Sequence, residues 1–111
     1  MRQLLPLLFL FFTSNAVSDQ NDTLFMSAEN LLTACTTADS DWISFCNGYL
    51  QAAHDLGAKQ GLICAPIGTT RTDLSNVYDR AAIEIRKNPT MKREAGFQVA
   101  LVLFSTAYPC K

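Results

Sequence analysis

Four cysteines and a single histidine are the residues of this chain with the greatest capacity for chemistry. The cysteines are Cys35, Cys46, Cys64 and Cys110. Cysteine side chains act as nucleophiles, hold zinc or form disulfides. Zinc ligands usually come in closely spaced pairs, whereas neighbouring cysteines here lie 11 or more positions apart, with no histidine cluster near them. We therefore predict two disulfides, no metal and no cofactor.

The histidine, His54, stands beside Asp55, a pairing that suggests a general base with an orienting carboxylate. Adjacent residues of a helix point about 100° apart, so we expect that Asp55 does not hold His54 in place. The sequence has no Gly-x-Ser-x-Gly nucleophile motif, and disulfides would remove the thiols as nucleophiles. The chain is predicted to be a binding protein and not an enzyme, with no small-molecule substrate.

The first residues have the pattern of a secretory signal peptide. Arg2 supplies positive charge, residues 4–12 are almost wholly apolar, and small residues follow them. Nine apolar residues are far fewer than the roughly 20 that span a bilayer. We predict a cleaved signal over residues 1–16 and a soluble exported protein over residues 17–111, although cleavage after Ser18 fits nearly as well.

The net charge of the chain is −1, and removal of Arg2 with the signal makes it −2. A charge this small argues against nucleic acids or membrane surfaces as partners. The mature length fits one small domain. Such a domain buries only roughly 60–65% of the surface that its unfolded chain exposes, so disulfides are useful in an exported protein.

The apolar residues have helical spacing throughout, and no β-alternation competes with it. The spacing predicts four helices joined by short connections, which favours an all-α fold, a small antiparallel four-helix bundle stapled by two disulfides. The helices are predicted from Leu24 to Cys35, from Trp42 to Gln60 with Ser40 or Asp41 as cap, from the cap Thr70 or Thr72 to Asn88, and from Pro89 to Tyr108.

The second predicted helix carries an apolar stripe that we expect to face the core. Its members are Trp42, Phe45, Cys46, Tyr49, Ala53 and Leu56. Trp42 and Tyr49 are of the types that anchor protein partners. Their positions in this stripe nevertheless predict that both are buried.

Helix geometry selects one pairing of the cysteines. The second helix is about 28 Å long, so Cys46 and Cys64 lie near opposite ends of the bundle and cannot bond to each other. Cys35 ends the first helix beside Cys46, and the fourth helix returns toward Cys64. We predict Cys35–Cys46 and Cys64–Cys110, which contribute about 3 and about 4 kcal/mol in the chain-entropy model.

The short sequences around the cysteines form a recognisable set. They are Leu31–Cys35, Phe45–Leu50 followed by Asp55, Cys64–Pro66 and Tyr108–Cys110. In this combination and order they resemble the Rap/Tai family of type VI secretion immunity proteins, over nearly the whole mature chain. One departure is that this chain has alanine at positions 52 and 53, where the family often has a small residue, frequently glycine.

The resemblance implies a small helical periplasmic protein, often a homodimer, that blocks a toxin injected by a neighbouring bacterium. In the characterised branch of the family the toxin is a peptidoglycan amidase with a cysteine nucleophile, and the immunity protein obstructs its substrate cleft. The second hypothesis is a small periplasmic helical stress protein or chaperone that binds unfolded proteins. A hydrolytic enzyme that depends on His54 is the third.

Two surfaces are candidates for contact with a partner protein. The first is a basic tip formed by Arg86, Lys87, Lys92 and Arg93. The dipole of the third predicted helix explains the first two cations, but the other two fall in the first turn of the fourth, where positive charge is unfavourable. The second surface is the loop from Ile67 to Arg71, in which Gly68 is free to adopt unusual backbone dihedrals.

Overall fold

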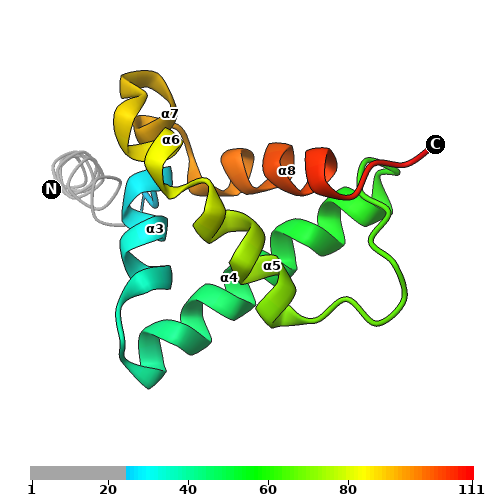
Figure 1. The fold of residues 1–111 in the computed structure, drawn as a ribbon, viewed down its shortest axis with the longest axis horizontal. Coiled ribbons are helices and arrows are strands. Elements are labelled where there is room, and N and C mark those ends of the chain that lie inside the picture. Colours follow the sequence, from blue (N-terminus) through cyan, green and yellow to red (C-terminus); the bar gives the residue numbers. More distant parts are fainter. Residues whose placement is uncertain (1–24) are drawn as a thin grey trace, which may run out of the picture.

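The computed structural model describes residues 25–111, in which the regular elements are helices (Figure 1). They are α3 (Ala28–Thr36), α4 (Ser40–Lys59), α5 (Arg71–Arg80), α6 (Ala82–Lys87), α7 (Pro89–Arg93) and α8 (Gly96–Ala107). The predicted all-α fold with two disulfides is therefore confirmed. The predicted signal peptide over 1–16, and the mature chain up to residue 24, lie outside the described residues. Within the described range, no helix is both long and apolar enough to cross a bilayer.

The third predicted helix divides into α5 and α6 at Ala81, where φ is −90° and ψ is 8° (Figure 1). The N–H of Ala81 donates to the carbonyl of Tyr78 at 3.1 Å. This hydrogen bond spans three residues, as in a 3₁₀ turn, in place of the four of an α-helix. The chain tightens there and α6 begins as a separate helix.

The fourth predicted helix also divides, into α7 and α8, because residues 94–95 are extended. The N–H of Ala28 donates to the carbonyl of Glu94 at 2.8 Å, and the N–H of Gly96 donates to the carbonyl of Met26 at 2.8 Å. These bonds hold the segment before α3 against the start of α8. A Cβ at position 96 would lie 2.9 Å from a leucine side chain of α3, so glycine permits this close approach.

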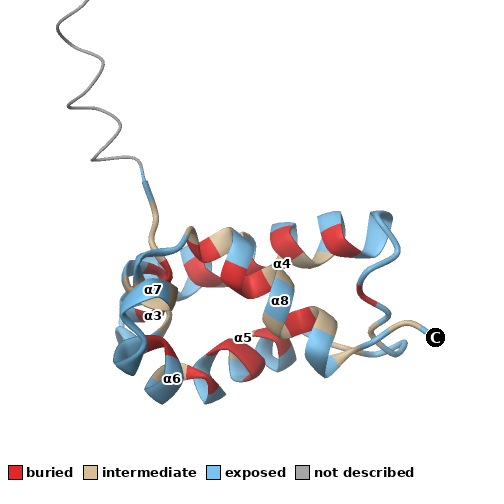
Figure 2. Cartoon of the chain, turned by 90° about the horizontal axis from the view of Figure 1, so that it is seen from above, coloured by how far each residue is buried: buried red, intermediate tan, exposed pale blue. Residues whose placement is uncertain are grey.

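The core forms around α4, which packs against α3, α5 and α8. Figure 2 shows the buried sides of the helices turned toward one another and the exposed sides turned outward. Tyr78 is fully buried, and its hydroxyl donates to the carbonyl of Ala28 at 2.8 Å. In residues 25–111 every buried side-chain nitrogen or oxygen has a hydrogen-bond partner. The largest fully buried side chains are Tyr78, Phe104, Leu31, Leu32, Leu50, Ile63, Ile85 and Cys46.

One of the two predicted helix caps is confirmed and the other is wrong. The hydroxyl of Thr70 accepts from the N–H of Asp73 at 3.1 Å, and the Asp73 carboxylate accepts from the N–H of Thr70 at 2.9 Å. This capping box starts α5. The N-cap of α4 is Asp39, without a side-chain capping bond, whereas Ser40 and Asp41 are already helical.

Candidate functional site

The two disulfides join Cys35 to Cys46 and Cys64 to Cys110, the pairs that helix geometry predicts. The first links the end of α3 to α4, and the sulfur of the buried Cys46 lies 3.7 Å from the hydroxyl of Ser75 on α5. The second links the loop after α4 to the segment after α8. The described part of the chain therefore holds no free thiol.

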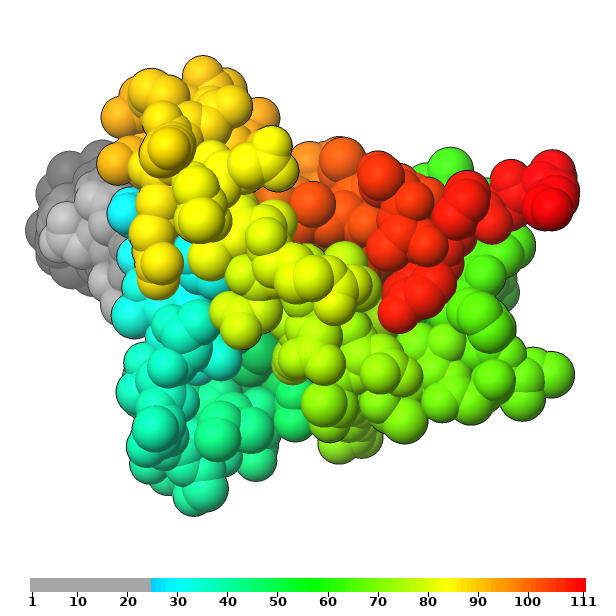
Figure 3. Space-filling model, viewed as in Figure 1, coloured from blue at the N-terminus to red at the C-terminus, as the bar shows by residue number. Residues whose placement is uncertain are grey.

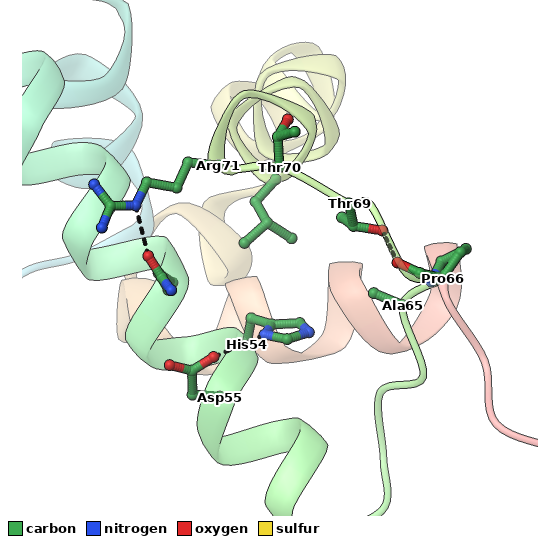
Figure 4. Close-up of a pocket in the computed structure, with 9 residues that line it drawn as sticks. His54, Asp55, Ala65, Pro66, Thr69, Thr70 and Arg71 are labelled. Carbon is green, nitrogen blue, oxygen red and sulfur yellow. Dashed lines mark hydrogen bonds and ion pairs between the residues drawn. The ribbon is translucent and has the colours of Figure 1, made fainter.

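His54 and Asp55 contact each other, contrary to the prediction from the sequence. Nδ1 of His54 lies 3.0 Å from Oδ1 of Asp55 (Figure 4). Both side chains lie at the surface of α4, where rotation about their side-chain bonds spans the angle between adjacent helical positions. The prediction that Asp55 does not hold His54 is wrong, and the pair forms part of the rim of a hollow.

This hollow, of about 220 Å³, lies between α4 and the loop that precedes α5 (Figure 4). Its two hydroxyl groups are both engaged in local structure. Thr69 donates its hydroxyl to the carbonyl of Pro66 at 2.7 Å, and the Thr70 hydroxyl accepts the capping bond of α5. On the opposite wall, Nε of Arg71 donates to Oε1 of Gln51 at 2.6 Å. Of these three hydrogen bonds, the one from Arg71 joins the start of α5 to α4, and the other two order the loop and the cap of α5.

Within the loop, residues 66–69 form a β-turn with Ile67 at its outermost position. The N–H of Thr69 donates to the carbonyl of Pro66 at 3.1 Å. Gly68, the third residue of the turn, has φ of +97°, which a type II turn requires and which glycine adopts without strain. Ile67 is fully exposed. The sequence predicted a loop in which Gly68 adopts unusual dihedrals, which is confirmed, and the structure adds that the loop contains a β-turn.

The basic tip has a different explanation from the one that the sequence suggested. Arg86 and Lys87 lie in the last turn of α6, as expected. Lys92 and Arg93 lie in the last turn of α7, and not in the first turn of a longer helix. Cations are favourable at a helix C-terminus. All four basic residues therefore lie at helix C-termini, where the helix dipole favours positive charge, and the predicted unfavourable arrangement is absent.

The apolar stripe of α4 is partly exposed, which the sequence did not predict. Trp42 is 45% exposed, Phe45 38% and Leu56 40%, so the prediction that they are buried is wrong. The rings of Trp42 and Phe45 lie 5.8 Å apart, those of Phe45 and Tyr49 5.7 Å apart, and Tyr49 meets Phe97 of α8 at 6.3 Å. We call residues 42, 45, 49, 52 and 56 the outer stripe of α4.

The reason for this exposure is that α4 carries two apolar stripes side by side. The core side of the helix is formed by Cys46, Leu50, Ala53 and Gly57, all buried. The outer stripe is offset by about 90° around the helix from this set, from the 100° turn per residue. Both sets have alternating spacings of three and four residues, so the sequence contains two stripes but does not indicate which of them faces the core.

No group of three or more histidine, cysteine or acidic side chains that could hold a metal occurs within residues 25–111. Burial raises the pKa of Tyr78, and the nearby Tyr49 raises it further. Burial also raises the pKa of Tyr49, against a smaller opposite effect of a hydrogen bond with the backbone of Phe97. Both phenols are thus held in their neutral form.

Comparison with known proteins gives one result that covers nearly all of the described chain. Residues 27–110 match the family of Rap1a immunity proteins. The matched range begins at the cap of α3 and includes both disulfides. No curated protein and no solved structure matches the chain significantly.

Proposed function

Because the chain belongs to the Rap1a immunity protein family, we propose that it protects the cell that produces it against a type VI secretion effector. In this proposal the protein is exported to the periplasm, where it binds a peptidoglycan amidase and obstructs the substrate cleft. The family match over residues 27–110 carries the proposal. Membership of an immunity family supports a cognate effector protein as the partner.

Steric obstruction of an enzyme requires a rigid complementary surface and no chemistry of its own. Surfaces that are ordered before binding lose less conformational entropy when the complex forms. Two disulfides, a capping box and the hydrogen bonds around the hollow supply such order in this small domain. These features support inhibition by occlusion.

Co-expression with the neighbouring effector tests the proposal. A peptidoglycan amidase encoded beside this chain, directed to the periplasm, should lyse cells, and co-expression of the full chain should restore their growth. A variant that lacks residues 1–16 serves as the control, since it should stay in the cytoplasm and give no protection. Absence of both rescue and complex formation would sink the proposal, and acid-dependent binding of unfolded proteins without an enzyme partner would favour the chaperone hypothesis.

We also propose that the protein is a homodimer whose two copies meet along the outer stripe of α4. The aromatic series Trp42, Phe45 and Tyr49 supports this interface, because large apolar side chains that remain exposed in one copy would be covered by the other. In an antiparallel pair of α4 helices, Asp41 at the start of one lies near Lys59 at the end of the other. Opposite charges at the two ends favour that orientation.

Size-exclusion chromatography with light scattering tests the dimer. Phe45→Glu should convert a dimer into a folded monomer, because it places a charge in the proposed interface without disturbing the core. Ile43→Glu is the matched control: Ile43 is 47% exposed on the same helical turn but lies off the outer stripe. A wild-type protein that is monomeric at micromolar concentration would contradict the interface.

A further inference from the structure

The basic tip concentrates positive charge in an otherwise acidic protein. Residues 82–94 hold its four cations together with two carboxylates, Glu84 and Glu94, which gives this segment a net charge of +2. The rest of residues 17–111 holds four cations and eight carboxylates, which gives a net charge of −4. The sequence therefore separates positive charge in the tip from negative charge in the remainder of the protein.

The cations of the tip have no acidic partner among residues 25–111. In that range the one ion pair joins His54 to Asp55, both on α4. The four basic residues of the tip are exposed, apart from Lys92, which is half-buried. Because the described fold does not pair these charges, they are available to a partner of opposite charge.

The tip is ordered although it consists of two short helices. The side chain of Asn88 accepts hydrogen bonds from the N–H groups of Thr90 and Met91, at 3.0 and 2.9 Å. The N–H of Asn88 donates to the carbonyl of Glu84 at 3.1 Å, so this residue both ends α6 and starts α7. Ile85 of α6 is fully buried, and Met91 of α7 packs against the core. The backbone that carries the cations is thus fixed before a partner binds, which lowers the entropy lost on binding.

The surface of the tip has relief as well as charge. Figure 3 shows the yellow and orange residues of α6 and α7 as a protrusion at the top of the molecule. Ile83 and Lys87 line an open hollow of about 550 Å³ beside these helices, and Ile83 is 67% exposed. An apolar side chain surrounded by cations fits a protein surface on which acidic groups surround an apolar one, since protein interfaces commonly have a polar rim.

A membrane of anionic lipid is the other partner that a basic tip attracts. Such a surface is negative everywhere, so it also repels the two carboxylates of the tip and the net charge of −4 on the rest of the chain. A folded protein can instead place its acidic groups opposite the cations alone. The distribution of charge therefore favours a protein as the partner.

From these observations we propose that the basic tip binds an acidic surface of the cognate effector and orients the two proteins as they approach each other. The proposal rests on the proposed function and names the chemistry of one contact surface on the partner. An acidic surface is attracted by the tip and repelled by the rest of the chain, so approach through the tip is favoured. The loop from Ile67 to Arg71, the other surface predicted from the sequence, lies at the start of α5, whereas the tip follows its end.

Stopped-flow measurement of binding to the purified effector tests this proposal. Arg86→Glu/Arg93→Glu should lower the association rate constant by about 10-fold or more at an ionic strength of about 20 mM, with a much smaller change in the dissociation rate constant. This difference from the wild type should shrink at about 500 mM salt, where charges are screened. Arg86→Lys/Arg93→Lys keeps both charges and should associate at the rate of the wild type.

Lys59→Glu/Lys111→Glu is the matched control. It changes the net charge of the protein by the same amount, and Lys59 lies in the last turn of α4 as Arg86 lies in the last turn of α6. This control should lower the association rate constant by less than about threefold, because its charges lie outside the tip. Lys87→Glu/Lys92→Glu, a second tip variant, should repeat the effect of the first. Thermal unfolding and light scattering check that each variant keeps the fold and oligomeric state of the wild type.

Equal association rates for the tip variants and the control, or a wild-type rate that does not depend on salt, would overturn the proposal while the immunity function stands. Sedimentation with vesicles of phosphatidylcholine and phosphatidylglycerol tests the membrane. Vesicle binding that Arg86→Glu/Arg93→Glu abolishes, together with unchanged association with the effector, would assign the tip to lipid and overturn the proposal. If the wild-type chain neither binds nor inhibits the effector, the proposed function fails and this contact fails with it.

Discussion

The two disulfides lie toward opposite ends of α4 and in different surroundings. Cys35–Cys46 joins two helices, and Cys46 is buried against the core. Cys64–Cys110 joins two segments without regular structure, and Cys64 is exposed. We call these regions the core end and the loop end.

This difference separates two uses of a crosslink. At the core end, packing among α3, α4 and α5 already holds the helices together, so the disulfide reinforces contacts that exist without it. At the loop end, Ile63 is the one residue of the segment 60–70 that is buried. The second disulfide therefore contributes to the shape of a surface as well as to the stability of the fold.

Removal of each disulfide should give the largest effects and tests this separation directly. Replacement of Cys64 and Cys110 by alanine should lower the free energy of unfolding by about 4 kcal/mol, and replacement of Cys35 and Cys46 by about 3 kcal/mol, because the first closes the longer loop. Urea unfolding of the oxidised proteins measures both values.

Inhibition of the effector should distinguish the same two variants more sharply than stability does. At temperatures where both remain folded, the variant without Cys64–Cys110 should inhibit more weakly, because its turn is less restrained. The variant without Cys35–Cys46 should inhibit as the wild type does. A larger loss of affinity for the effector in the variant without Cys35–Cys46 would contradict the distinction between the core end and the loop end.

Features that depend on regular helix geometry could be predicted from the sequence. The length of α4 excludes a bond between Cys46 and Cys64, and the position of Cys35 beside Cys46 across the first turn then selects the observed pairing. Thr70 followed three residues later by Asp73 is the sequence pattern of a capping box, and in the structure this box starts α5. The loop before α5 and the positive φ of Gly68 could also be predicted, from the residue types alone.

The features that were missed depend on contacts between distant residues. The division between α7 and α8 is set by hydrogen bonds from Ala28 and Gly96 to residues far away in the chain. The exposure of Trp42 depends on which of two apolar stripes the neighbouring helices cover, and periodicity is the same for both. Which stripe stays exposed, the outer stripe of α4, therefore became visible only once the core was assembled.

Replacement of Tyr78 measures how much a hydrogen bond contributes to the stability of the core end, in a protein that keeps both disulfides. Tyr78→Phe removes the hydroxyl that donates to the carbonyl of Ala28, while that carbonyl keeps its place in the first turn of α3. We expect a loss of about 0.5–1.5 kcal/mol in the free energy of unfolding, the usual net contribution of one hydrogen bond. Inhibition of the effector should not change, since the bond lies far from the loop end.

The same residue predicts a dependence on alkaline pH. Burial raises the pKa of Tyr78 in the folded protein above the value of about 10 for an unfolded chain. The stability from its neutral form is fully present below pH of about 10 and is lost as the pH rises further, because the unfolded chain then releases the proton first. Tyr78→Phe should flatten this loss in pH-dependent unfolding curves, and an equally steep loss in the variant would contradict the assignment.

Two glycines of α4 should give the smallest effects, with opposite signs. Gly48 lies in the half nearer the core end, and an added Cβ there meets nothing within 4 Å. Gly57 lies beneath Ile63 at the loop end, and an added Cβ would come within 2.8 Å of Cγ1 of that side chain. Because alanine is favoured over glycine inside a helix by about 1 kcal/mol, Gly48→Ala should stabilise the protein by about that amount.

For Gly57→Ala the same gain in helix propensity is opposed by overpacking, which typically destabilises by about 1–3 kcal/mol. We expect a net loss of about 1 kcal/mol in thermal or urea unfolding. The displaced side chain is Ile63, which anchors the loop to α4, so this variant should also weaken inhibition of the effector, whereas Gly48→Ala should not. If the two variants unfold and inhibit alike, the loop end does not depend on the contact between Ile63 and α4.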